Sequence, residues 1–283
     1  MISYAADVYR GTTGAERNLL NLGLYMSFFP KMIQGPIERY QGMGARIRSR
    51  HVTPELFACG ARRFIYGLGK KVILANQFGS VVDKVLANPM DQISGGLGWY
   101  VGILYTLQIY FDFSGYSDMA IGMGRMFGFH FQENFQYPYA ATTVKEFWRR
   151  WHISLSTWFR DYLYIPLGGN RKGRGRTWAN RFIVFFATGL WHGASWNFVL
   201  WGLWHGCFSV LEDSGALPVG RLRGRFLGRV YTLLVVVLGF TLFRADTLGQ
   251  AGAMLAAMFT GAGLNWTGTA TVCSLLDPAC LLT

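Results

Sequence analysis

The sequence predicts an all-α integral membrane protein, a polytopic bundle with re-entrant and interfacial helices around a tunnel. Three observations support this fold class: few charged residues, long uncharged segments, and basic runs beside those segments. Of the 283 residues, 51% are hydrophobic and 15% are charged, whereas a soluble domain carries about 25% charged residues. Residues 182–210 and 230–243 contain no Asp, Glu, Lys or Arg, and about 20 apolar residues span a bilayer.

The positive charge of the chain is better explained by a membrane than by nucleic acid. The formal net charge is +12, but the basic residues form short runs beside apolar segments, as in loops that face the cytoplasm. No nucleic-acid-binding motif accompanies them. Four scattered cysteines, without the spacing of a zinc site or a disulfide framework, predict no metal centre: Cys59, Cys207, Cys273 and Cys280.

The first half of the chain predicts three apolar elements. Residues 19–37 form one short or kinked span, because Pro30 and Pro36 interrupt its second half. Residues 56–86 mix basic with apolar side chains, which is typical of an interfacial or partly buried helix pair. Residues 97–124 are long enough to cross a membrane, although they include polar side chains that rarely face lipid, namely Gln108, Asp112, Ser114 and Asp118.

Residues 144–164 form an amphipathic block with its aromatic side chains at helical spacing. One face carries Trp148, Trp151, Leu155, Trp158 and Tyr162, and the other carries Arg149, His152, Ser156 and Arg160. The block is either a plain interfacial helix with an aromatic belt or part of a site.

The segment 182–210 is longer than one perpendicular span needs, so it is either strongly tilted or bent near its middle. Basic runs flank it at 171–181 and 221–229. If the segment is a re-entrant hairpin, both runs lie on the cytoplasmic side. Pairs of glycines four residues apart predict close helix packing inside a bundle: Gly189 with Gly193, and Gly202 with Gly206.

His192 is the leading candidate for chemistry. In a continuous helix Thr188, His192 and Ser195 share one face of an uncharged segment, which suggests the wall of a cavity. The ring is either a buried histidine bonded to a nearby carbonyl or a general base, because imidazole titrates near neutral pH. His152 is the second candidate: it either orients or polarises a carbonyl group or caps a polar face. His205 points elsewhere in a continuous helix and is interpreted as structural.

The carboxylates favour structural roles. Asp112 and Asp118 are six positions apart and do not share a helical face, so one of them is expected to pair with an arginine such as Arg149 and the other to bond across a helix contact. Asp161 either holds a histidine or pairs with Arg160, and the ion pair is the preferred interpretation.

Several long runs resemble the membrane-bound O-acyltransferases of bacteria, and most closely their alginate O-acetyltransferase branch. These runs are YFDFSGYSDMAIG at 110–122, ENF at 133–135, WHISLSTW at 151–158, RDYLYIPLGGNR at 160–171 and WHG at 191–193. The similarity extends from about Tyr4 to about Asp246.

The resemblance implies acyl transfer through a tunnel, with the family's catalytic histidine at His192 and its second histidine at His152. It implies a multi-pass protein of the bacterial inner membrane, in contact with lipid, that binds no cofactor and takes acetyl groups from acetyl-CoA. The acceptor would be an extracytoplasmic polysaccharide such as alginate, reached with periplasmic acetyltransferase partners. The polar residues expected to bind substrate or line the tunnel are Asp112, Ser114, Asp118, Asn134, Arg149, Ser156, Asp161, Thr188 and Ser195.

Two alternatives stay open. Within the family, the same runs occur in proteins for D-alanyl transfer to teichoic acid and for peptidoglycan O-acetylation. Outside it, the chain could be a non-catalytic transporter or scaffold, although no inverted repeat is found. Residues 1–283 are expected to form a single acyltransferase domain that lacks the family's spans before Tyr4 and has a short part after Asp246, and therefore to be inactive alone.

Overall fold

The computed structural model describes residues 1–88, 93–217, 219 and 226–260, and every regular element in them is a helix. The all-α prediction is therefore confirmed. The chain groups into two units, which are described separately. Unit 1 comprises Met1–Lys71, Phe113–Pro138 and Trp148–Gly169, and unit 2 comprises Val72–Asp112, Tyr139–Phe147 and Asn170–Thr283. The prediction of a single acyltransferase domain remains a prediction.

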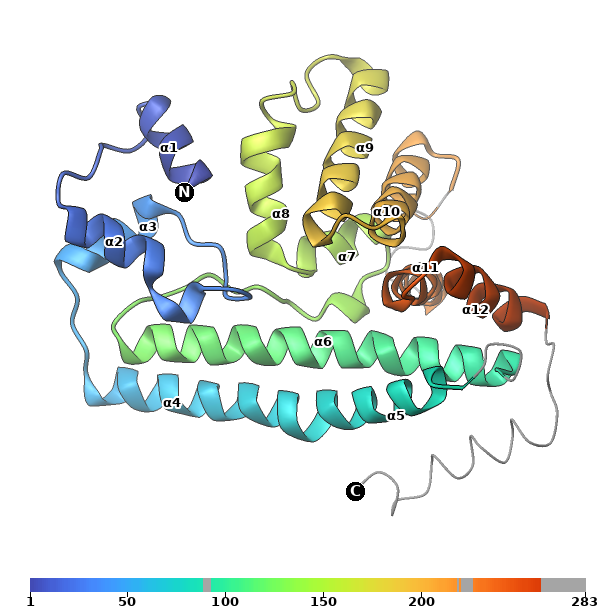
Figure 1. Cartoon of the computed structure of the whole chain (residues 1–283). Coiled ribbons are helices and arrows are strands. Elements are labelled where there is room, and N and C mark those ends of the chain that lie inside the picture. Colours follow the sequence, from blue (N-terminus) through green and yellow to red (C-terminus); the bar gives the residue numbers. More distant parts are fainter. Residues whose placement is uncertain (89–92, 218, 220–225, 261–283) are drawn as a thin grey trace. The chain divides into compact units, whose positions relative to one another are not determined.

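Unit 1 is built on a close pair of helices. α4 (Pro54–Gly69) begins at Thr53, whose side chain accepts a hydrogen bond from the backbone N–H of Leu56, and it lies alongside the second half of α6 (Gly95–Met126) in Figure 1. Glycines seven residues apart make this approach possible. A Cβ atom at Gly60 would lie 2.6 Å from the carbonyl oxygen of Gly122, and one at Gly115 would lie 2.7 Å from that of Gly67. Any larger residue at these positions would push the helices apart.

The remaining helices of unit 1 are short. They are α1 (Ile2–Tyr9), α2 (Leu19–Ser27), the 3₁₀ turn Phe29–Lys31, α3 (Tyr40–Arg48), α8 (Ile153–Phe159) and the π turn Arg160–Tyr164. A cluster of apolar side chains packs α2 and α3 against the end of α6 and the segment after it, and it includes Tyr25, Phe28, Met43, Ile121 and Phe129.

The predicted span at 19–37 is wrong. The helix α2 has nine residues, which at 1.5 Å per residue is about 14 Å and too short to cross a bilayer. The chain leaves the helix at Phe28, which is extended with φ −63° and ψ 105°, and Pro30 then sits in the 3₁₀ turn. Pro30 has no backbone N–H to donate to the carbonyl four residues earlier, so α2 cannot continue through it.

The pair of helices predicted at 56–86 is present, as α4 and α5 (Asn76–Leu86), joined by the π-helical turn Lys70–Ala75. In unit 2, α5 packs on the first half of α6. There Val81, Val82 and Val85 share an apolar cluster with Leu97 and Val101.

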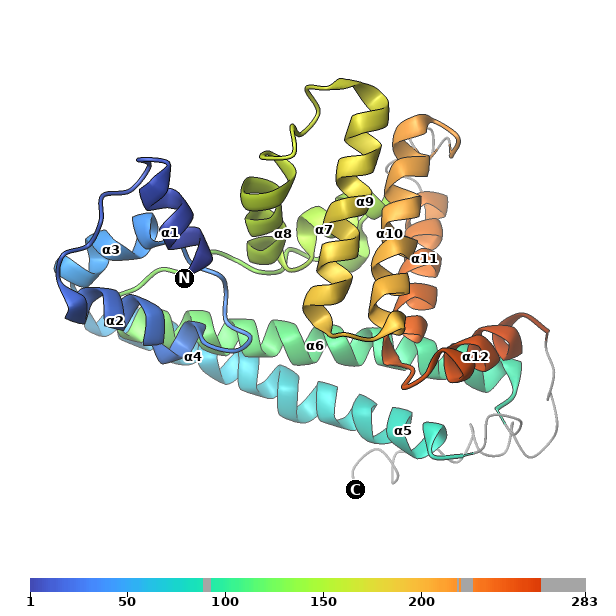
Figure 2. The same ribbon diagram turned by 45° about the horizontal axis from the view of Figure 1, so that its top comes forward.

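Unit 2 also holds a helical hairpin. α9 (Gly173–His192) and α10 (Trp196–Ser214) are separated by residues 193–195, so the segment 182–210 is bent near its middle, one of the two predicted arrangements. Figure 2 shows the two helices side by side with α11 (Phe226–Arg244). The predicted role of Gly189 and Gly202 in close packing is confirmed. A Cβ atom at Gly189 would collide with the carbonyl oxygen of Phe198, and one at Gly202 with that of Phe185.

Within the described residues, one helix meets the criteria of length and apolarity for a membrane span: Phe226–Arg244, with mean hydropathy 2.0 over its most apolar window. The helix α12 (Leu248–Thr260) is apolar but shorter. Multiple spans and a re-entrant path of the hairpin therefore remain predictions. Of the basic run 221–229, residues 221–225 lie outside the described part of the chain, as do Cys273 and Cys280.

Candidate functional site

His152 lies at a break between two helices in the amphipathic block. The helix α7 (Val144–Arg150) ends two residues before it, and α8 begins directly after it. The prediction of uninterrupted helical spacing through 144–164 is therefore wrong at this point. His152 has φ 43° and ψ 54°, in the left-handed region, which non-glycine residues rarely adopt and which persists only when the surroundings impose it.

Hydrogen bonds between Asn134 and the residues around the break provide that constraint. The Oδ1 atom of Asn134 accepts hydrogen bonds from the backbone N–H of Ser154 (3.2 Å) and the hydroxyl of Ser154 (2.9 Å), and lies 3.1 Å from Nδ1 of His152. Its Nδ2 atom donates to the hydroxyl of Ser117 at 3.1 Å. The exposed fractions of Asn134 and His152 are 1% and 5%, so water does not compete for these bonds. The Asn134 backbone carbonyl also accepts from the N–H of Ile153 at 3.0 Å.

The network determines which nitrogen of His152 carries the proton. A backbone N–H can only donate, so the side-chain atom of Asn134 that faces Ser154 is its oxygen. The same oxygen faces Nδ1 of His152, and Nδ1 must therefore be the protonated nitrogen. In the neutral ring the lone pair is then on Nε2, which makes Nε2 a proton acceptor.

The ring of Phe113 packs against the same imidazole, and two further aromatic rings continue the cluster. The rings of Phe113 and His152 pack edge to face. Their centroids lie 4.6 Å apart, and the angle between their planes is 88°. The ring centroid of Phe135 lies 5.0 Å from the ring centroids of both Phe113 and Trp151. The ring of His152 is thus held in one orientation by packing as well as by hydrogen bonds.

His192 has a different environment. It is the last residue of α9, and its ring is partly buried. Its ring is nearly perpendicular to those of Trp201 (5.0 Å, 89°) and Phe243 (5.1 Å, 87°), with Phe198 at 6.3 Å. Its side chain makes no hydrogen bond to another described residue. The imidazole is therefore confined by apolar faces at the turn of the hairpin.

The predicted polar stripe through His192 is only partly formed. Thr188 is buried on α9, where its hydroxyl donates to the carbonyl of Val184 at 2.8 Å. Ser195 lies beyond the end of α9, and its side chain caps α10 by accepting from the N–H of Asn197. The prediction that Thr188, His192 and Ser195 share one helical face is wrong for Ser195, because the helix ends at His192.

Asp118 belongs to a charged cluster in unit 1. Arg63 donates to Asp118 from Nε at 3.0 Å and to Glu133 from Nη1 at 2.6 Å, and Lys70 donates to Asp118 at 2.6 Å. The expected pairing of this carboxylate with an arginine is confirmed, but the partner is Arg63 and not Arg149. The cluster joins α4 to α6 and the segment after it, which is a structural role.

Asp161 forms the ion pair that the sequence favoured. Arg160 donates from Nε at 2.7 Å, and Arg39 forms a second ion pair from Nη2. Burial alone would raise the pKa of the Asp161 carboxyl, but the hydrogen bonds from Arg160 and Arg39 outweigh it and hold this pKa below its ordinary value. Asp161 therefore anchors the π turn after α8 and holds no histidine in the described structure.

The other predicted site residues lie in varied surroundings. Ser156 donates weakly to the carbonyls of Trp148 and Trp151, at 3.3 and 3.5 Å, and so ties the chain around the His152 break. Ser114 is buried on α6, Asp112 is partly buried there, and Arg149 is exposed on α7. His205 is fully buried beside Trp201 and Phe147, in agreement with a structural role.

Sequence reasoning missed Ser154 and Ser117, which complete the Asn134 network. Ser154 lies only two residues after His152, which was a possible signal. In an uninterrupted helix, however, residues two apart point in different directions, so Ser154 was not expected beside His152. It also missed the glycine pairs of α4 and α6, whose seven-residue spacing was visible in both segments. No group of three His, Cys, Asp or Glu side chains suited to a metal ion occurs in the described ranges.

Comparison with known proteins gives consistent matches. The profile of the membrane-bound O-acyltransferase family matches residues 14–215. A probable alginate O-acetylase of Pseudomonas putida is 46% identical over 92% of this chain and 53% of its own length. The peptidoglycan O-acetyltransferase of Helicobacter pylori is 36% identical over 88% of this chain and 47% of its own. The teichoic acid D-alanyltransferase of Streptococcus thermophilus is 32% identical over 67% of this chain and 49% of its own.

The chain spans about half the length of these curated relatives. The profile match nevertheless covers the described helices from α2 to α10, including His152, Asn134 and His192. The helical fold, the matched profile and the extent of identity lead to one conclusion: the chain belongs to the membrane-bound O-acyltransferase family.

Proposed function

We propose that the protein is a membrane O-acetyltransferase that passes acetyl groups from cytoplasmic acetyl-CoA toward hydroxyl groups of an extracytoplasmic polysaccharide of the alginate type. The probable alginate O-acetylases of Pseudomonas and Azotobacter, 44–46% identical over 92% of the chain, support this acceptor. The observation that carries the proposal is His152, a buried imidazole whose Nδ1 proton is held by Asn134.

In the proposed reaction, a hydroxyl oxygen attacks the acyl carbon, a C–O bond forms and the C–S bond to coenzyme A breaks. His192 takes the hydroxyl proton as general base, and that proton then passes to the departing thiolate. An apolar surrounding favours the neutral, proton-accepting imidazole. His152, in unit 1, is a second imidazole, whose Nε2 accepts a proton when the ring is neutral and can donate one when the ring is protonated.

The membrane arrangement is part of the proposal. The protein crosses the bacterial inner membrane several times, and the α9–α10 hairpin enters and leaves on the cytoplasmic side. The basic residues in the first turns of α9 support this orientation. Single cysteines placed in 171–181 and 221–229 should both be protected from an impermeant thiol reagent added outside intact spheroplasts and labelled after lysis. Labelling of one run from outside would rule out the re-entrant path.

In this proposal the attacking hydroxyl belongs to a first acceptor, and periplasmic acetyltransferase partners pass the acetyl group from it to the polysaccharide. A second candidate function is O-acetylation of peptidoglycan, and the Helicobacter pylori relative favours it. D-alanyl transfer to teichoic acid is the third, supported by more distant relatives. The alternative outside the family is a non-catalytic transporter or scaffold. In that case another protein would make the acetyl esters.

The deciding experiment compares cells with and without the gene, and measures ester-linked acetyl groups on secreted polysaccharide and on peptidoglycan, and ester-linked D-alanine on the envelope. Loss of acetyl groups from the polysaccharide alone, restored by the unmodified gene, supports the proposal. Loss from peptidoglycan, loss of D-alanine, or no change in any ester would contradict it.

A further inference from the structure

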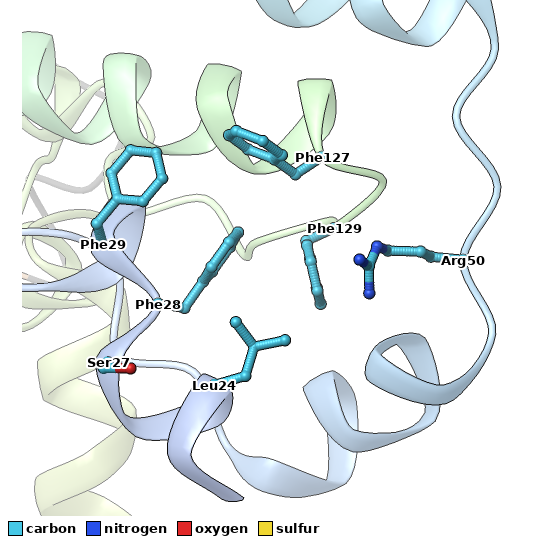
Figure 3. Close-up of a pocket in the computed structure, with 7 residues that line it drawn as sticks. All are labelled: Leu24, Ser27, Phe28, Phe29, Arg50, Phe127 and Phe129. Carbon is cyan, nitrogen blue, oxygen red and sulfur yellow. The ribbon is translucent and has the colours of Figure 1, made fainter. Parts of the chain in front are cut away.

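Unit 1 contains an aromatic pocket, and the residues that line it are distant in sequence from His152 and His192. Its volume is about 280 Å³, and its apolar walls are Leu24, Phe28, Phe29, Phe127 and Phe129 (Figure 3). The walls come from α2, the turn after it and the segment that follows α6. Binding pockets for whole small molecules measure about 300–1,000 Å³, so this pocket fits part of a ligand.

The pocket has a closed floor and an exposed aromatic rim. Phe28 and Phe129 are 6% and 2% exposed, with their ring centroids 4.6 Å apart. Phe29 and Phe127 are 54% and 45% exposed, and they meet edge to face at 5.7 Å. The exposed apolar surface continues along the chain to Ile33, which is 92% exposed. Such a rim suits a surface that faces lipid tails.

Arg50 supplies a positive charge at the edge of the pocket. Its guanidinium lies over the ring of Phe129 at 5.6 Å, and Nη1 donates one weak hydrogen bond to the carbonyl of Ile47 at 3.4 Å. Arginine has five N–H donors. Nearby Arg48 and Arg39 are paired with Glu16 and Asp161, whereas Arg50 has no carboxylate partner among the described residues.

From this combination we infer that the pocket binds an anionic phospholipid, with one acyl chain between the phenylalanines and the headgroup phosphate at Arg50. The apolar lining suits a hydrocarbon chain and offers little to a nucleotide, because the hydroxyl of Ser27 already donates to the carbonyl of Gly23 at 2.8 Å. The unpaired guanidinium recognises the negative phosphate. The inference uses the family's membrane location and does not depend on the proposed acetyl transfer.

Photo-crosslinking tests this assignment directly. The purified chain is mixed with phosphatidylglycerol that carries a diazirine in one acyl chain, or with the matched phosphatidylcholine, and crosslinked peptides are mapped by mass spectrometry. We expect labelling of the peptides that contain Leu24, Phe28 and Phe129, and more from phosphatidylglycerol. Arg50→Gln should lower the phosphatidylglycerol signal about fivefold, since one basic residue near a lipid surface contributes about that factor, and leave the phosphatidylcholine signal unchanged.

Two further variants make the test specific. Arg17→Gln removes another exposed arginine of unit 1 and should change neither signal. Ser27→Trp places a large side chain at an exposed position of the pocket wall and should lower labelling by both lipids. Size-exclusion profiles of each variant are compared with that of the unmodified protein to check that the variant remains folded.

Three outcomes would overturn the assignment: equal labelling of the pocket by both lipids, an equal loss for both in Arg50→Gln, or competition by soluble glycerol phosphate, which would indicate a site for free phosphate. Displacement of the label by acetyl-CoA would instead make the pocket a donor site. None of these results depends on whether the protein acetylates a polysaccharide.

Discussion

The two candidate histidines are held in opposite ways. The ring of His152 is anchored by Asn134, at a left-handed break that hydrogen bonds to neighbouring residues reinforce. His192 sits at a helix end, between the rings of Trp201 and Phe243, without a hydrogen bond to a described residue. Asn134 therefore fixes the proton position of His152, whereas no hydrogen bond to a described residue fixes that of His192.

This difference suits the two rings to different roles. A ring with a fixed tautomer is suited to orienting a reacting group, because its acceptor is always the same atom. A ring surrounded by apolar side chains is held in its neutral form, because burial disfavours the charged imidazolium, and the neutral ring is the form that can accept a proton. The predictions below test the surroundings of each ring. Those for His152, Asn134 and His192 use acetylation in cells normalised to the protein in the membrane, and those for Gly202 and Asp161 use thermal stability.

His152→Ala should reduce acetylation a hundredfold or more, because a positioned acid or base contributes about 10²–10⁴-fold. The matched control is Ser156→Ala on α8, whose hydroxyl makes only weak bonds to main-chain carbonyls, and which should retain at least half of the activity. If His152→Ala kept more than a tenth of the activity, the anchored ring would have no catalytic role.

Asn134→Ala should reduce acetylation about ten- to a hundredfold, the range found when a metal-ligating histidine loses the partner that orients it. Asn134→Asp keeps an acceptor for Nδ1 and should recover part of the rate. Its added negative charge favours the protonated ring, so the acidic limb of the pH–rate profile should move to higher pH. An unchanged profile in Asn134→Asp would show that Asn134 acts only in packing.

The sequence predicted the parts of this account that depend on local pattern. The long helix expected at 97–124 is α6, and the bend in 182–210 falls at residues 193–195. Helices and bends of this kind depend on the composition and spacing of residues within one or two helical turns of each other. The ion pair of Asp161 with Arg160 was also predictable, since the two are neighbours.

Contacts between distant segments were not predictable. Asp118 pairs with Arg63, 55 residues earlier, and Asn134 meets His152, 18 residues later. The break at His152 was hidden because its aromatic neighbours keep a helical period, although hydrogen bonds to Asn134 change the backbone there. A sequence pattern reports which residues share a helix face, but not what the opposite surface supplies.

The site at His192 should depend on hairpin packing. Gly202→Leu places a side chain against the carbonyl of Phe185, and we expect a loss of about 1–3 kcal/mol in stability, with a lower melting temperature in detergent. Gly175→Ala on the same hairpin, where a Cβ meets nothing within 4 Å, serves as the control. An unchanged melting temperature in Gly202→Leu would contradict the close packing of α9 and α10.

Asp161→Asn should have the smallest effect, about 0.5–1 kcal/mol at pH 7. The folded pKa of Asp161 is lowered, so its ion pairs stabilise the protein above the unfolded value of about 3.9 and are lost as the pH falls through the folded pKa. The variant and the unmodified protein should therefore converge in thermal stability at acidic pH. A constant difference across pH would assign the effect to packing.

The most direct test of the account is the activity of His192→Ala in the full-length protein, measured as polysaccharide acetylation per amount of protein in the membrane. The matched control is Leu190→Ala, at an exposed position on the same turn of α9. A general base predicts less than about 1% of the normal rate for His192→Ala, with normal membrane levels, and near-normal acetylation for Leu190→Ala. Retention of more than about a tenth of the rate by His192→Ala would contradict the assignment of His192 as the catalytic base.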